Sequence, residues 1–404
     1  MNKKYLPSAL IMYLNYFIHG VGCSILGQAV IKEALAVAWG VEAMAITAIS
    51  AALGLGRLIA LPFAGPLSDK LGRRISTAIG SASYAVYLIG LAFAFSAGQN
   101  GGYQIAYVCA IIGGISNSFL DTGIYPAVAE IISSAPGVAT MGIKFFIAIA
   151  QMLLPFVLGV AVTTTATGMV SYNPLFIGCG IIYAVLFVLI FLFPLPDSEQ
   201  KAEGKSEGLI ASLKHTNFSF ESIAMIVIGF TCTGTFQLWL NCAQNFAKEN
   251  AGWANPSIMQ TYYSAGTLMA LVVTSLLTRK IKDVRFILVY PVICLVTLVA
   301  VLIGHSQTLM IAGAFIIGWA GAGGLLQIVT SVCNMLFPKI KGTVTALVMI
   351  ASSLCNYTIL TAASKMAPSH VMIMNIVLTA IGVLLGLFVN ARYAKMVSLA
   401  ESDE

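Results

Sequence analysis

The most informative stretch of the sequence is Gly65-Pro66-Leu67-Ser68-Asp69-Lys70-Leu71-Gly72-Arg73-Arg74. It concentrates charge between two apolar segments. It holds three cations and one carboxylate, whereas apolar runs end just before it at Phe63 and begin just after it at Ile75. Lys and Arg collect in the cytoplasmic loops of membrane proteins, and glycine permits a tight reversal of the chain. The stretch therefore predicts a short, basic, glycine-bent loop that joins two membrane-spanning helices.

The composition of the whole chain is typical of a protein that crosses a membrane many times. Its 404 residues are 59% hydrophobic and only 9% charged, whereas soluble domains carry about 25% charged residues. A helical crossing needs about 20 apolar residues. Twelve such runs are found, near 6–31, 41–63, 75–97, 103–130, 138–163, 174–194, 221–246, 257–278, 286–304, 308–337, 342–364 and 369–391. We therefore predict an all-α membrane protein with twelve transmembrane helices in two six-helix bundles.

The distribution of Lys and Arg predicts the orientation of these helices. If the N-terminus is inside, sixteen of the 21 Lys and Arg residues fall in cytoplasmic segments. Lys32, Lys248 and Lys365 fall outside, and Arg57 and Lys144 lie within spans. This asymmetry predicts that both termini are cytoplasmic. It also explains the net charge of +6 without a nucleic-acid partner.

One long polar stretch, at 196–220, separates six apolar runs from the other six. We predict an N-terminal bundle over 1–195, a cytoplasmic linker over 196–220, and a C-terminal bundle over 221–404 that ends in a short cytoplasmic tail. Residues that match at one offset of 205 suggest two related halves, namely Gly113, Gly137, Thr140 and Gln151 opposite Gly318, Gly342, Thr345 and Asn356. Proteins built from such repeats bind their solute near mid-membrane, between the halves.

The pattern Gly-x-Leu-x-Asp-x-x-Gly-Arg-Arg resembles the loop between the second and third helices of the major facilitator superfamily. The resemblance implies a carrier that works by alternating access. It also implies that the motif residues form a cytoplasmic gate, namely Gly65, Asp69, Gly72, Arg73 and Arg74. We expect the carboxylate of Asp69 to pair with an Arg or with the N-terminus of a neighbouring helix.

Four ionisable residues lie inside predicted spans: His19, Arg57, Asp121 and Lys144. A charge in the hydrocarbon costs about 2.5–3.5 kcal/mol on insertion scales, so such residues usually have a function. At a rise of about 1.5 Å per residue, the last three are expected at similar heights in the first bundle. One carboxylate between two cations leaves one positive charge, which a bound anion would neutralise. The alternative is a permanent ion-pair network that holds the bundle together.

The segment 114–126, GISNSFLDTGIYP, resembles the fourth helix of fucose-permease-like symporters. In those proteins a carboxylate at the position of Asp121 takes part in proton and sugar coupling. Their first-helix carboxylate is absent from this sequence, which leaves His19 as a second candidate for proton coupling. The uncharged residues predicted to contact substrate, together with Arg57 and Lys144, are Asn15, Tyr16, Asn117, Gln151, Gln237, Asn241, Gln327 and Asn356.

We therefore predict a monomeric carrier of the bacterial inner membrane that takes up a small polar solute together with protons. A carboxylate, such as a hydroxy acid or an aromatic acid, suits the two cations. An exporter or exchanger of the same fold and a sugar–proton symporter are the alternatives. We expect no enzymatic activity, since no catalytic residue set, metal-ligand spacing or cofactor motif is found.

Overall fold

A computed structural model describes residues 3–195, 220–278, 280–337 and 341–402, and most of these residues are helical. The chain divides into two compact units, Met1–Lys205 (unit 1) and Ser206–Glu404 (unit 2). The predicted linker lies outside the described residues except for Phe220, which begins a helix. Its boundaries therefore stay a prediction.

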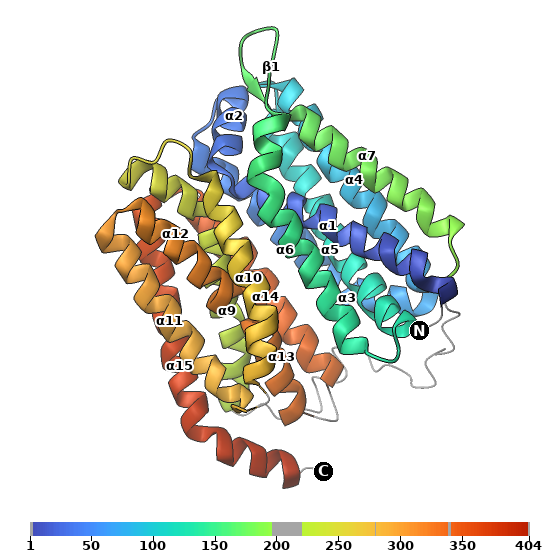
Figure 1. Cartoon of the computed structure of the whole chain (residues 1–404), viewed down its shortest axis with the longest axis vertical. Coiled ribbons are helices and arrows are strands. Elements are labelled where there is room, and N and C mark those ends of the chain that lie inside the picture. Colours follow the sequence, from blue (N-terminus) through green and yellow to red (C-terminus); the bar gives the residue numbers. More distant parts are fainter. Residues whose placement is uncertain (1–2, 196–219, 279, 338–340, 403–404) are drawn as a thin grey trace. The chain divides into compact units, whose positions relative to one another are not determined.

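Unit 1 contains the six predicted N-terminal spans, together with a short extra helix and a hairpin (Figure 1). Its elements are η1 (Lys3–Tyr5), α1 (Leu6–Ser24), η2 (Ile25–Gly27), α2 (Ala29–Trp39), η3 (Ala43–Ile46), α3 (Thr47–Leu71), α4 (Arg73–Ala97), α5 (Gly102–Ile131), α6 (Pro136–Ala161), β1 (Thr163–Thr164), β2 (Val170–Ser171) and α7 (Asn173–Leu192). The two strands pair antiparallel. This hairpin was not predicted, because each strand has only two residues.

Unit 2 contains the six predicted C-terminal spans. Its elements are α9 (Phe220–Asn250), η4 (Pro256–Ile258), α10 (Met259–Leu277), α11 (Asp283–Gly304), α12 (Gln307–Ile316), η5 (Ile317–Ala322), α13 (Leu325–Leu336), α14 (Lys341–Ala363) and α15 (Pro368–Ser402). The last helix has 35 residues, more than the approximately 20 that one crossing needs.

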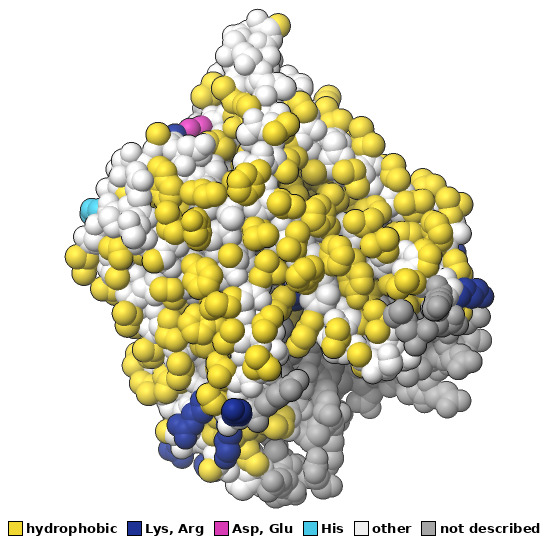
Figure 2. Space-filling view, viewed as in Figure 1, with side chains coloured by type: hydrophobic (Ala, Val, Ile, Leu, Met, Phe, Trp, Pro, Cys, Tyr) yellow, Lys and Arg dark blue, Asp and Glu magenta, His cyan; other side chains and the backbone are white. Residues whose placement is uncertain are grey.

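Eleven helical segments in the described part of the chain are long and apolar enough to cross a membrane. The remaining predicted span, 257–278, corresponds to α10, whose first turns contain the polar run 260–264. Apolar side chains are spread over much of the face that Figure 2 shows. Examples are Val160, Leu192 and Ile303, which are 89%, 69% and 75% exposed. Lipid chains would solvate such side chains, so the prediction of an all-α membrane protein is confirmed.

The two units share one packing scheme, in which helices at equivalent places in each unit pack against each other. In unit 1 these pairs are α1 with α6, α3 with α5, and α4 with α7, whereas in unit 2 they are α9 with α14, α10 with α12 and η5, and α11 with α15. Glycines permit the closest crossings, as is usual in lipid. A Cβ on Gly56 or Gly114 would overlap the backbone of the opposite helix, α5 or α3. Gly266 and Gly318 form the equivalent crossing between α10 and η5.

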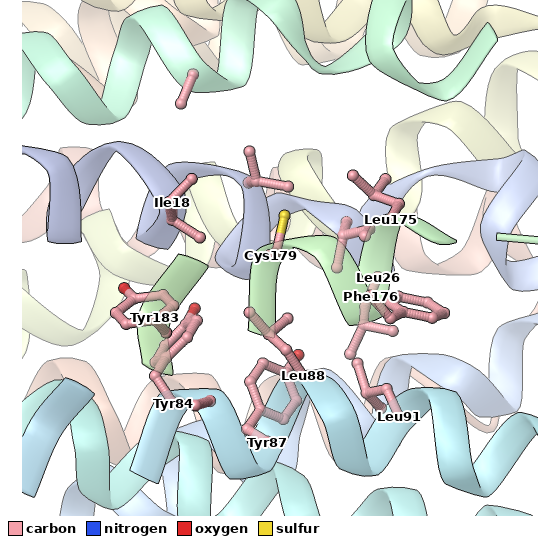
Figure 3. Packing of buried hydrophobic residues seen from close by; sticks show 14 of the residues in the cluster. Ile18, Leu26, Tyr84, Tyr87, Leu88, Leu91, Leu175, Phe176, Cys179 and Tyr183 are labelled. Atoms are coloured by element: carbon pink, nitrogen blue, oxygen red, sulfur yellow. The ribbon is translucent and has the colours of Figure 1, made fainter. Parts of the chain in front are cut away.

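Tyrosines fix the position of α1 in unit 1. Figure 3 shows the rings of Tyr84, from α4, and Tyr183, from α7, facing each other, and their centroids are 4.7 Å apart. The Tyr183 hydroxyl donates to the backbone oxygen of Asn15 at 2.7 Å. The middle of α1, which carries three of the predicted site residues, is thereby held against α4 and α7.

The first predicted span, 6–31, was wrong in extent, because it consists of two helices. Helix α1 ends at Ser24, and Gln28 is extended (φ −75°, ψ 124°) before α2 begins. The Gln28 amide donates to the backbone oxygen of Ser24 at 3.2 Å and so satisfies one carbonyl freed by the break. Lys32, predicted outside the membrane, lies within α2 and donates to Thr47 Oγ1 at 2.7 Å.

The predicted span 308–337 is likewise interrupted. The π-helix η5 follows α12, and Gly324 has a φ of 146°, a conformation that favours glycine. Helix α13 begins directly after it. Uniform apolar composition hides this break, because hydropathy does not report the hydrogen-bond pattern of the backbone.

The stretch 65–74 is mostly helical, so the predicted glycine-bent loop was wrong. Helix α3 continues through Pro62 and Pro66 to Leu71, and only Gly72, with a φ of 88°, separates it from α4. A Cβ on Gly65 would meet open space. The apolar run ends at Phe63, but the helix projects further as a charged end.

Candidate substrate and proton site

An ion pair between α3 and α5 forms the centre of the candidate site. Arg57 Nη2 donates to Asp121 Oδ2 at 2.7 Å. The glycine crossing at Gly56 and Gly114 brings the two helices close enough for this contact. The Arg57 and Asp121 side chains are 22% and 30% exposed. The pair is therefore only partly enclosed by protein.

Helix α1 supplies a second partner for the same carboxylate. The Tyr16 hydroxyl donates to Asp121 Oδ1 at 2.5 Å, and Tyr16 itself is buried. Its ring contacts Tyr125 and His19 edge-on, with centroid distances of 5.6 and 5.4 Å. The Nδ1 atom of His19 is buried and has no hydrogen-bond partner among the described residues.

Lys144, on α6, is the third charge of the cluster. It interacts electrostatically with both Asp121 and Arg57, and His19 in turn is influenced by all three charges. No hydrogen bond or ion pair links the Lys144 ammonium to another described residue. The structure thus brings together the four ionisable residues that were singled out in the spans, and Lys144 is the one whose charge is not paired.

The predicted amides of unit 1 have different environments. Gln151 donates to Ser24 Oγ at 2.6 Å, next to the break after α1. Asn15 accepts from Ser81 Oγ at 2.6 Å and is completely buried. These two amides connect helices. Asn117, one turn before the carboxylate on α5, has a buried Oδ1 atom with no hydrogen-bond partner in the described part of the chain.

Two of the predicted amides of unit 2 bond each other. Asn241 donates to the backbone and side-chain oxygens of Gln237 at 2.9 and 3.2 Å. Gln327 is exposed, and the Oδ1 atom of Asn356 is buried without a partner among the described residues. A role for these residues in substrate binding stays a prediction.

Arg73 organises the charged end of α3. Its Nη1 atom donates to Asp69 Oδ1 at 2.8 Å and to Ser68 Oγ at 3.1 Å, and its Nε atom lies 3.6 Å from Glu130 Oε1. Asp69 therefore pairs with an Arg, one of the two partners expected for it. Glu130 was not predicted as a partner of Arg73. Its position at the end of α5, on the same side of the membrane as the motif, was the signal that could have indicated this contact.

Arg74 contacts the end of α7. Its guanidinium donates to the backbone oxygens of Phe191 and Phe193 at 3.2 and 3.1 Å. The last carbonyls of a helix lack partners within the helix, and a cation near them is favourable. The motif thus links α3, α4, α5 and α7 at one end of unit 1, while a gating role for it stays a prediction.

The fold and the buried charges define an all-α membrane transporter. The chain belongs to the Major Facilitator Superfamily, whose family model matches residues 12–357. It is similar to the MFS-type transporter YfkL of Bacillus subtilis (32% identical, covering 98% of this chain and 99% of the relative). It is also similar to the inner membrane transport protein YdiM of Escherichia coli (29% identical, covering 98% and 96%). The protein is a transporter and not an enzyme.

Solved structures show the same fold at low sequence identity. The D-xylose–proton symporter superposes with a TM-score of 0.73 at 17% identity, covering 96% of this chain and 97% of that structure. The fucose–proton symporter FucP of E. coli gives a TM-score of 0.63 at 14% identity, covering 96% and 99%. These structures show the same fold, and the family match over residues 12–357 confirms the predicted resemblance to the major facilitator superfamily.

Proposed function

We propose that this transporter takes up a small organic carboxylate together with protons. The observation that carries the proposal is the unpaired charge of Lys144 beside the Arg57–Asp121 pair. Because Asp121 balances only one of the two cations, the cluster retains one positive charge. A carboxylate solute would complete it through charge-assisted hydrogen bonds.

Protonation of Asp121 links the two bound species in this scheme. A neutral carboxyl attracts a guanidinium much less than a carboxylate does, so the proton would release Arg57 from its pair. The planar guanidinium can then bind a solute carboxylate through two parallel hydrogen bonds. Proton and anion would thus bind together and leave together, which is symport. Solved proton symporters have this fold, so the scheme requires no new architecture.

The surroundings of the cluster favour a hydroxy acid or an aromatic acid. The buried Oδ1 atom of Asn117 can accept a hydrogen bond from a solute hydroxyl. Tyr125, whose ring contacts that of Tyr16 beside the carboxylate, is half-buried and offers aromatic surface to a solute ring. His19 would serve as a second proton-accepting group. We further propose cytoplasmic termini, supported by the Lys and Arg distribution, and a bacterial inner membrane, supported by the relative YdiM. The monomeric state stays a prediction.

A thermal-shift screen of the purified protein tests this function, because a ligand stabilises the state that it binds. Benzoate and lactate represent the expected acids, whereas glucose and alanine represent other solute classes. We expect the two acids to raise the unfolding temperature, and to do so more strongly at mildly acidic than at alkaline pH. Stabilisation by glucose alone would instead favour the sugar–proton symporter.

The charge of Lys144 can be tested separately. Lys144→Gln should remove the stabilisation by benzoate or lactate, weakening binding roughly tenfold or more, because a charge-assisted contact is lost. Lys144→Arg keeps the charge and should bind within a few-fold of the native protein. Equal binding by native protein and Lys144→Gln would contradict the assignment.

A further inference from the structure

The two oxygens of the Asp121 carboxylate are bound by donors from two different helices. Arg57 on α3 binds Oδ2 at 2.7 Å, and Tyr16 on α1 binds Oδ1 at 2.5 Å. Tyr16 is only 2% exposed. Its ring lies against Tyr125 and His19. The phenol is therefore packed in place, and its hydroxyl is aimed at the carboxylate.

These two donors differ in what they can do when the carboxylate takes up a proton. A guanidinium has only donors, whereas a phenol can donate or accept. A proton that arrives from water and binds Oδ1 turns that oxygen into a donor. Arg57 cannot accept this hydrogen bond, but the Tyr16 oxygen can. Tyr16 is thus able to bond the ionised carboxylate as a donor and the neutral acid as an acceptor.

The other groups around the carboxylate act through charge or packing. Arg57 comes from α3 and Lys144 from α6, and a substitution at Tyr16 changes neither residue. His19, on α1 with Tyr16, contacts the ring of Tyr84 on α4. Deleting the Tyr16 hydroxyl removes one donor and leaves these neighbouring groups in place.

We propose that Tyr16 is a positioning residue of the proton site, which holds the Asp121 carboxylate toward Arg57 and sets the pH at which it takes up a proton. The inference rests on the proposed function in that it assigns Tyr16 to the proposed proton acceptor. The hydroxyl can bond both forms, but its bond to the ionised form is charge-assisted and the stronger of the two, so that loss of the hydroxyl disfavours the ionised form more. Its removal should therefore move protonation to higher pH.

Infrared titration of the purified full-length protein tests this proposal without a known solute. The band of the protonated carboxyl is assigned by its loss in Asp121→Asn. In Tyr16→Phe we expect its titration midpoint to rise by about one pH unit, a roughly tenfold change in proton affinity. The matched control is Tyr13→Phe, since Tyr13 is also on α1 but donates to the backbone oxygen of Ala139 at 2.9 Å. An unchanged midpoint in Tyr16→Phe, or an equal rise in Tyr13→Phe, would overturn the proposal.

A second variant covers the case in which Tyr16→Phe does not fold. Replacing Tyr16 with 3-fluorotyrosine preserves the packing and makes the hydroxyl a stronger donor, so the midpoint should fall, and no movement would overturn the proposal. The outcome is separable from that of the proposed function. If the titration midpoint shifts in Tyr16→Phe but transport by the native protein does not depend on the pH gradient, only the proposed proton coupling is refuted. An unshifted band in a proton-coupled carrier would refute only the role of Tyr16.

Discussion

Unit 1 and unit 2 share one scheme of helix packing but differ in the chemistry of their interiors. Unit 1 holds Arg57, Asp121 and Lys144 within its spans. In the described spans of unit 2, Asp, Glu, Lys and Arg lie only near the helix ends. Its interior instead contains neutral bonds, such as that between the hydroxyls of Thr235 and Thr379 at 2.8 Å. The packing scheme therefore does not depend on charged residues inside the spans, and we expect sensitivity to pH to be confined to unit 1.

Substitutions at the glycine crossings test the helix packing that the two units share, and they should give the largest losses of stability. Gly56→Ala in unit 1 and Gly266→Ala in unit 2 should each lower the free energy of unfolding by about 3 kcal/mol, because the new methyl group overlaps the backbone of a neighbouring helix. Chemical unfolding in detergent measures the loss. Gly65→Ala is the control, since its methyl group meets open space within a helix. If either crossing variant were as stable as this control, the two units would not share this packing requirement.

Substitutions in the ion pair test the charged cluster, which is found in unit 1. Arg57→Gln leaves the Asp121 carboxylate with one donor fewer and should cost about 2 kcal/mol of unfolding free energy, less than a fully buried pair because both side chains are partly exposed. Asp121→Asn, added to Arg57→Gln, should restore most of the stability. A double-mutant cycle measures this coupling, and additive losses would show that the two residues do not stabilise each other.

The neutral bonds of unit 2 should give the smallest effect. Thr235→Val removes the hydroxyl contact with Thr379 and should cost about 1 kcal/mol or less. The loss should be the same at acidic and alkaline pH, because neither partner titrates. Unfolding measured at both pH values checks this. A loss that depends on pH would break the contrast between the two units.

The sequence was sufficient to predict the spans and the fold class, because a crossing helix needs about 20 predominantly apolar residues. It was also sufficient to find Asp121, since a carboxylate in an apolar run is conspicuous. The bond between Tyr16 and Asp121 was not predicted, because it depends on how α1 is rotated against α5. The breaks at Gln28 and Gly324 were missed for a related reason, since both are changes in backbone conformation within apolar sequence.

The charged motif shows the same limit. Arg73 and Arg74 were expected to mark a loop, but Arg73 bonds a residue one turn away and Arg74 binds the carbonyls that end α7. Local spacing could suggest the first contact. The second contact joins Arg74 to Phe191, which is 117 residues away in the chain. No local pattern indicates such a contact.

The most direct test of the central claim, that Asp121 couples solute to protons, is accumulation by Asp121→Asn in proteoliposomes. The probe is whichever of benzoate or lactate stabilises the native protein, with a pH gradient as the only driving force. We predict that the native protein accumulates the acid against its gradient, whereas Asp121→Asn loses accumulation but still exchanges labelled for unlabelled acid. Full accumulation by Asp121→Asn would contradict the account.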